Sequence, residues 1–312
     1  MTAATVTATF ASGRRQIVDV RRKMLLTAKW RLIQVLLLFA MLAFIAVTRV
    51  VYLGMDQERP ELLESNVKGK NPFKDKKVRE AIHRSIDVDA IKRTVMRGQA
   101  FPTNLMVAPG INGYMKDLDK RPALLKPDEA KKLLADAGYP NGFEVGMDCP
   151  NDRYVNDDKI CQAVVAMLAK IGIKVNLRAQ TRNLYFAKIL RKADFKPGET
   201  SFYMLGWSPA QTYDVHNVFE ALIQTPNAAT KKGQFNAGGY SNPEVDKLAD
   251  AMEQETDKAK RDAMIAKATK LYVDDFAYIP LHQQALVWAA RKNIDLVQPA
   301  DNTFPLRFVT VK

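Results

Sequence analysis

A long apolar run near the N-terminus is the strongest hydrophobic feature of the chain. In residues 32–48, fifteen of seventeen positions are apolar and none is charged, and a second apolar run, 50–53, follows Arg49. As a helix, residues 32–53 would measure about 33 Å, against about 30 Å of bilayer hydrocarbon. The pattern therefore predicts a transmembrane helix over 32–53.

The residues around this run suggest its orientation. Seven Lys and Arg residues precede it, so the positive-inside rule predicts a basic cytoplasmic tail over 1–31 and export of everything after the helix. Arg49 would snorkel to the outer headgroups. A cleavable signal peptide is the alternative, but the basic region is about thirty residues long and no Ala-x-Ala site follows. Residues 54–70 are polar and predict a linker.

Beyond residue 71 the pattern alternates helices with strands, which predicts an α/β fold. Asp75 and Asp87 are placed to cap helices, and Pro127 to occupy a first helical turn. A helical repeat over 156–171 precedes an alternating strand over 173–179, so a parallel strand–helix–strand unit is expected. Further strands are expected at 143–147, 201–205, 285–289 and 307–311, and helices after Pro243 and around Met264.

Composition and charge remove several classes of function. The 312 residues, 47% of them hydrophobic, are enough for about two packing units. Of the net charge of +13, a large share lies in residues 1–59, which hold nine basic and three acidic residues, so nucleic acid is not an expected partner. The three scattered histidines form no metal motif, and no nucleotide or hydrolase motif occurs. We expect no metal and no cofactor.

Two short patterns leave alternatives open. Cys149 and Cys161 are twelve positions apart in the expected exported region, where a disulfide is permitted, but two buried thiols are equally compatible with the sequence. Ser65 and Lys68 spell the SxxK string of penicillin-recognising serine enzymes. That string lies in the expected linker and lacks the companion motifs, so a nucleophilic role is disfavoured.

The best candidate for a binding site is the segment 206–217. It follows an expected strand, and open α/β sheets bind ligands beyond the carboxyl ends of their strands. Trp207 offers an apolar wall, and Asp214 a charge for a ligand ammonium group. Alternatively, Trp207 is a core residue and Asp214 caps the following helix.

Several motifs resemble the family 5 extracellular solute-binding proteins, the dipeptide and oligopeptide receptors of ABC importers. They are NPFKDKKVREAI at 71–82, SID at 85–87, AGYPNGF at 137–143, MLAKIGI at 167–173, LGW at 205–207, YSNPEVD at 240–246 and IPLH at 279–282. The resemblance covers 71–312. It implies part of a periplasmic binding protein type II-like lobe that binds a peptide or other small solute, partners an ABC permease and catalyses nothing.

The resemblance also implies roles for individual residues. In peptide-binding members an Asp after the Gly-Trp pair holds the ligand α-amino group, and Asp214 is the matching position. Tyr213 and Asn217 flank it, Trp207 would form a wall of the cleft, and Arg153 is a candidate for the ligand carboxylate. The segment that builds most of the first lobe in this family has no counterpart here, which implies a truncated receptor.

Residues 21–53 resemble instead the membrane anchor of class B penicillin-binding proteins. The sequence thus predicts a receptor fragment tethered to the inner membrane by one helix, with its N-terminus in the cytoplasm and its main domain in the periplasm. The alternatives are a cell-division or cell-wall protein related to that second family, and a fusion fragment without function.

Overall fold

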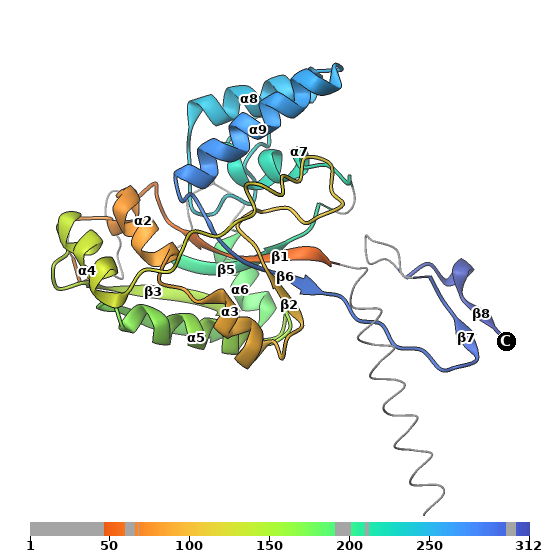
Figure 1. The fold of residues 1–312 in the computed structure, drawn as a ribbon, viewed down its shortest axis with the longest axis horizontal. Helices are drawn as coiled ribbons and strands as arrows, with labels where there is room; N and C mark the ends of the chain where they lie inside the picture. The colour runs from red at the N-terminus through yellow and green to blue at the C-terminus, as the bar shows by residue number, and fades with distance from the viewer. Residues whose placement is uncertain (1–46, 60–65, 68, 191–200, 210–211, 298–303) are drawn as a thin grey trace, which may run out of the picture. The chain divides into compact units, whose positions relative to one another are not determined.

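A mixed six-stranded sheet organises the protein (Figure 1). The structure, a computed structural model, describes residues 47–59, 66–67, 69–190, 201–209, 212–297 and 304–312. The strand order is β2-β6-β1-β5-β3-β4. The strands are β1 Val47–Met55, β2 Ala100–Pro102, β3 Phe143–Pro150, β4 Ile173–Gln180, β5 Phe202–Trp207 and β6 Ile279–Ala285, and a separate two-stranded sheet pairs β7 Ile294–Asp295 with β8 Thr310–Val311.

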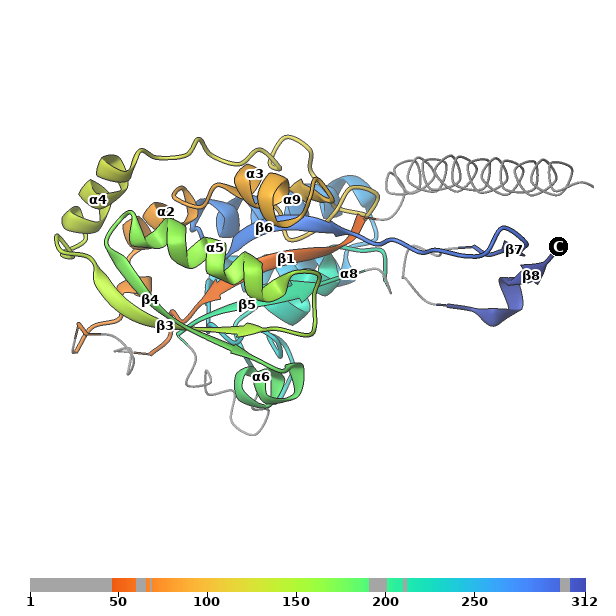
Figure 2. The same ribbon diagram turned by 90° about the horizontal axis from the view of Figure 1, so that it is seen from below.

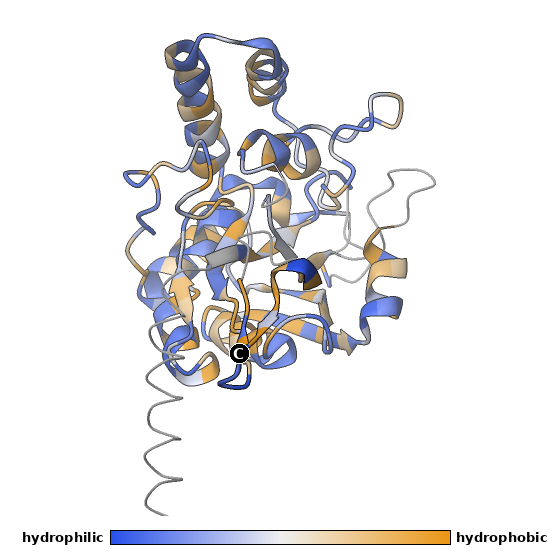
Figure 3. Ribbon diagram, turned by 90° about the vertical axis from the view of Figure 1, so that its right-hand side faces the viewer, coloured by the Kyte–Doolittle hydropathy of each residue, from blue (hydrophilic) through white to orange (hydrophobic). Residues whose placement is uncertain are grey.

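Helices cover both faces of the large sheet. One hydrophobic cluster joins the sheet to α2, α4 and α5, and a second joins the other face to α6, α8 and α9. Figure 3 shows these helices banded in hydrophilic and hydrophobic residues. The helical segments are η1 Pro72–Lys74, α2 Lys76–His83, α3 Val88–Ala90, η2 Ile91–Val95, α4 Pro127–Asp136, α5 Asp157–Ala169, α6 Arg182–Ile189, α7 His216–Val218, η3 Phe219–Ile223, α8 Pro243–Gln254, α9 Lys258–Asp274 and η4 Leu306–Phe308.

The helix starts predicted from capping residues are confirmed by the hydrogen bonds of those residues. The Asp75 carboxylate accepts the backbone N–H of Lys77, and the Asp87 carboxylate accepts that of Ala90, so both residues cap as predicted. Pro127 begins α4. The strand–helix–strand unit is confirmed as well: β3 and β4 pair in parallel, and α5 lies along them (Figure 2).

The predicted transmembrane helix over 32–53 is wrong in its last seven residues. Val47–Met55 form β1, which pairs antiparallel with both β5 and β6. Val51 and Leu53 enter one hydrophobic cluster, while Tyr52 between them enters the other. A central strand with both faces covered is apolar at successive positions, and a membrane helix shows the same composition.

Two further boundaries of that prediction change with it. Arg49 lies in β1, opposite Gln284 of β6. The linker predicted over 54–70 loses its first residues, because Met55 ends β1 and the side chain of Asp56 is fully buried. In the part of the chain that the structure describes, no helix has the length and apolar character needed to cross a membrane. Residues 1–46, and Ser65 and Lys68 of the SxxK string, lie outside it.

The two strands predicted near the C-terminus differ from the observed ones. The strand expected at 285–289 lies earlier, over β6, and shares only Ala285 with the prediction. The strand expected at 307–311 is reduced to the two residues of β8, after the short helix η4.

Cys149 and Cys161 form a disulfide with the two Cα atoms 6.6 Å apart, so the alternative of two free thiols is wrong.

Candidate functional site

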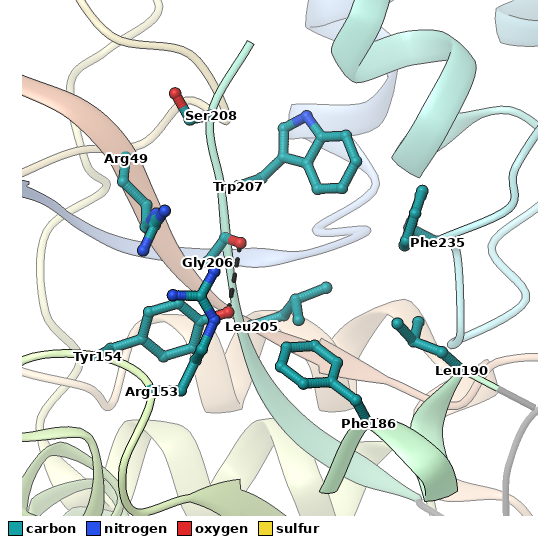
Figure 4. A pocket seen from close by; sticks show the side chains of 10 residues that line it. All are labelled: Arg49, Arg153, Tyr154, Phe186, Leu190, Leu205, Gly206, Trp207, Ser208 and Phe235. Atoms are coloured by element: carbon teal, nitrogen blue, oxygen red, sulfur yellow. Dashed lines mark hydrogen bonds between the residues drawn. The ribbon is translucent and has the colours of Figure 1, made fainter. Parts of the chain in front are cut away.

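A pocket of about 290 Å³ lies at the carboxyl end of β5 (Figure 4). Its walls come from the start of β1, the loop after β3, the end of α6, the end of β5 and the chain before α8. None of its ten lining residues is acidic. They are Arg49, Arg153, Tyr154, Phe186, Leu190, Leu205, Gly206, Trp207, Ser208 and Phe235.

One side of the pocket is cationic. The guanidinium carbon of Arg49 lies 5.6 Å from the centre of the Tyr154 ring, and that of Arg153 lies 5.2 Å from it. In the described residues no carboxylate forms an ion pair with either arginine. Burial lowers the pKa of Arg49, and the charge of Arg153 lowers it further. Two positive charges that repel each other across one pocket would be stabilised by an anionic group.

The other side is aromatic and apolar. The Trp207 indole lies 4.9 Å from the Phe235 ring, between ring centres, and its Nε1–H donates a hydrogen bond of 3.0 Å to Oδ1 of Asn217. This hydrogen bond fixes the tilt of the indole. Phe186 of α6 and Leu190 at its end complete the apolar wall. The pocket thus pairs a charged end with an apolar end, as small-molecule sites commonly do.

Gly206 joins the two ends, and its lack of a side chain has a structural reason. The Tyr154 hydroxyl donates a hydrogen bond of 3.4 Å to its carbonyl oxygen. A Cβ at this position would lie 2.7 Å from Cε1 of Tyr154 and 3.1 Å from Cδ of Arg49. Any side chain here would displace the ring on which both guanidinium groups lie.

We expect Gly206→Ala to lower the free energy of unfolding by about 1–3 kcal/mol, the usual cost of overpacking. A urea titration measures it. In a Tyr154→Leu background, which removes the clashing ring edge, the same substitution should cost less than half as much. An equal cost in both backgrounds would mean that the ring does not cause the strain.

The structure brings some of the predicted site residues together and leaves others apart. Trp207 and Arg153 both line the pocket. Asn217 does not line it, but its side chain accepts the hydrogen bond that orients the Trp207 indole. Tyr213 and Asp214 do not line it. Tyr213 is 44% exposed and has a left-handed backbone with φ of 52°.

The Asp214 carboxylate already accepts four hydrogen bonds from three residues. Arg261 donates to both carboxylate oxygens, at 3.0 and 2.8 Å. The side-chain amide of Asn112 donates at 2.7 Å, and the backbone N–H of His216 at 2.8 Å. Asp214 is not the helix cap considered as the alternative, because Val215 is the N-cap of α7 and no described side chain caps that helix. Burial raises the pKa of Asp214, but these hydrogen bonds outweigh burial and hold it below its ordinary value. A ligand ammonium group would have to displace Arg261 to reach this carboxylate.

Sequence reasoning missed Arg49, Tyr154, Phe186, Leu190 and Phe235. Arg49 carried a usable signal, since it is a charged residue inside an apolar run, but the membrane interpretation assigned it to the headgroups. The other four come from three segments that lie far apart in the sequence, at Tyr154, at Phe186 and Leu190 of one helix end, and at Phe235, and only the fold brings these segments together.

Comparisons with known proteins agree with this architecture. The model of the bacterial extracellular solute-binding proteins, family 5, matches residues 33–230. The glutathione-binding protein GsiB of Pectobacterium atrosepticum is 31% identical over 224 residues, which are 72% of this chain and 42% of that protein. GsiB of Salmonella typhi is 30% identical over 223 residues, with the same shares covered.

Solved structures show the same fold. A dipeptide-binding protein from Pseudoalteromonas, in complex with Met-Leu, matches with a TM-score of 0.70 and 23% identity over 86% of this chain and 49% of that one. The periplasmic binding protein DppA of Helicobacter pylori, in complex with the peptide STSA, matches with a TM-score of 0.62 and 23% identity, covering 76% and 42%.

The chain belongs to family 5 of the bacterial extracellular solute-binding proteins. It spans less than half the length of the curated relatives it matches. The family match begins at residue 33, inside the predicted membrane helix over 32–53 and well before residue 71, where the motifs of the resemblance begin.

Proposed function

We propose that this chain binds a small peptide-like solute through a carboxylate and passes it to an ABC permease, without catalysis. The observation that carries the proposal is the pair of guanidinium groups, Arg49 and Arg153, in a pocket without an acidic lining residue. Arginine suits this task because its planar fork can donate two parallel hydrogen bonds to one carboxylate.

The apolar end of the pocket supports a ligand with a hydrophobic part. The rings of Trp207, Phe235 and Phe186 all line the pocket on the side away from the arginines, within reach of a group whose carboxylate lies at the arginines (Figure 4). A peptide carries both chemistries in one small molecule. The named ligands of the relatives, glutathione, Met-Leu and the peptide STSA, are all small peptides, and Met-Leu carries two large apolar side chains.

Asp214 and the N-terminal apolar run play no part in this proposal. An ammonium anchor at Asp214 stays a proposal of lower rank, because Arg261 occupies that carboxylate. Tethering through a helix over 32–53 is not carried forward, since β1 takes up its last seven residues. A periplasmic location is proposed with the receptor function, because family 5 proteins are extracellular binding proteins.

Thermal unfolding of the intact chain with three additives tests the proposal. Met-Leu should raise the midpoint, because a ligand that binds only the folded state stabilises it by about 2.7 kcal/mol at one hundred times its dissociation constant. Met-Leu amide, which lacks the carboxylate, should raise it much less. S-methylglutathione, with two carboxylates and no free thiol, tests a more anionic peptide.

The shifts of the unfolding midpoint distinguish carboxylate recognition from peptide binding in general. Equal shifts with Met-Leu and its amide would refute carboxylate recognition while leaving peptide binding intact. No shift with Met-Leu or S-methylglutathione, in a protein that unfolds cooperatively, would contradict a peptide-binding function for this chain.

A further inference from the structure

One short loop carries half of the cationic side of the pocket, since Arg49 comes from β1. Residues 151–156 connect β3 to α5 and contribute both Arg153 and Tyr154. The Arg153 side chain is exposed, whereas Tyr154 is 7% exposed and forms the surface on which the two guanidinium groups lie. An exposed arginine is costly to fix in place, so its backbone must be well held if its position is to serve binding.

The carboxylate of Asp157 holds that backbone from inside the protein. Asp157 is the first residue of α5 and is 2% exposed. Its Oδ2 accepts the backbone N–H groups of Arg153, at 2.9 Å, and Tyr154, at 3.0 Å, and its Oδ1 accepts that of Asp158, at 3.0 Å. No Lys, Arg or His in the described residues forms an ion pair with it.

Burying a carboxylate away from water is costly when no cation pairs with it. Backbone N–H donors and the positive end of a helix dipole offset this cost. Asp157 has both, and two of its donors belong to the residues that form the cationic side of the pocket. The loop therefore supplies the donors that allow Asp157 to be buried, and the Asp157 carboxylate in turn holds the backbone of the loop in shape.

The disulfide closes the same segment from outside the loop. Cys149, in β3, and Cys161, in α5, are both fully buried and are bonded to each other, so the chain between them is a closed ring of thirteen residues. Closure of a ring of this size removes many conformations that would compete with the native one. Asn156, whose side-chain amide donates to the carbonyl of Val95 at 2.9 Å, adds a further tie.

We propose that Asp157 and the Cys149–Cys161 disulfide are positioning elements for solute binding: together they hold the loop that carries Arg153 and Tyr154, which makes carboxylate binding dependent on the redox state of these cysteines. The inference rests on the proposed function, since it assigns a regulation to that pocket. Pre-organised groups bind more tightly because less freedom is lost on binding.

A first experiment needs no ligand. In the intact chain, hydrogen exchange followed by mass spectrometry on peptides that cover residues 150–157 should quicken about tenfold or more in Asp157→Ala, because two charge-assisted hydrogen bonds to backbone N–H groups are lost. Asp158→Ala is the matched control, with the same charge change one residue later in the same helical turn. Equal exchange in the two variants would overturn the assignment of Asp157.

The second experiment measures binding of Met-Leu by calorimetry. Asp157→Ala should weaken binding about tenfold and Asp158→Ala less than twofold, with the carboxamide variant Asp157→Asn in between. The double variant Cys149→Ala/Cys161→Ala should bind Met-Leu severalfold more weakly than wild type. The two proteins are compared at a temperature where circular dichroism shows both to be fully folded. Treatment with a phosphine reductant should weaken wild-type binding and leave that double variant unchanged.

The two experiments separate the two proposals. If wild-type protein takes up no Met-Leu, the proposed function fails for that peptide, and the exchange rates still decide whether Asp157 and the disulfide hold the loop. If wild-type protein binds and the cysteine variant binds equally well while its loop exchanges at the wild-type rate, the positioning role of the disulfide is refuted.

Discussion

Simultaneous replacement of Arg49 and Arg153 by alanine should lower the affinity for Met-Leu at least about a hundredfold. Hydrogen bonds to a charged group contribute about 1.5–3 kcal/mol each, and both donors to the ligand carboxylate would be lost. The two residues also repel each other in the free protein, where burial and the charge of Arg153 lower the pKa of Arg49. Calorimetric titration of the intact variant measures the loss.

Two comparisons make this result specific to the pocket. Arg93→Ala/Arg291→Ala removes the same charge from two exposed positions that do not line the pocket, and it should bind normally. Arg49→Lys/Arg153→Lys keeps the charge but loses the planar fork, and we expect an intermediate affinity. Unchanged binding in the alanine variant would place the ligand elsewhere.

Much of the fold could be predicted because its signals are local. Asp75 and Asp87 cap helices through bonds to backbone N–H groups two or three residues away, and a short sequence window contains both partners. The parallel unit of β3, α5 and β4 follows from a change of hydrophobic period within about forty residues. Such features depend little on the rest of the molecule.

The errors arose where the deciding partner is distant in sequence. Residues 50–53 are apolar because β5 and β6, more than 150 positions away, flank β1 while helices cover both its faces. Asp214 follows the Gly-Trp pair as an anchor would, yet Arg261 binds it, and no short pattern announces that pairing. Trp207 and Arg153 were predicted separately, and only the sheet topology brings them together.

Acidification should destabilise this protein through a buried histidine. His282, in β6, is fully buried between β1 and β2, and neither ring nitrogen forms a hydrogen bond with a described residue. Burial lowers its pKa from 6.5 to about 4. The unfolded chain then binds a proton between these two values that the folded chain does not, so the stabilisation present above pH 6.5 is lost as pH falls toward 4.

The expected size is about 3 kcal/mol over that interval, because each pKa unit corresponds to about 1.4 kcal/mol. His282→Leu isolates it: leucine does not titrate, so the difference in unfolding free energy between variant and wild type should change by this amount between pH 6.5 and 4 in urea titrations. His83, whose pKa burial and then the charge of Arg121 lower, should keep the variant partly pH-sensitive. A difference that stays constant with pH would mean that His282 is protonated equally in both states and that β6 is open to water at this position.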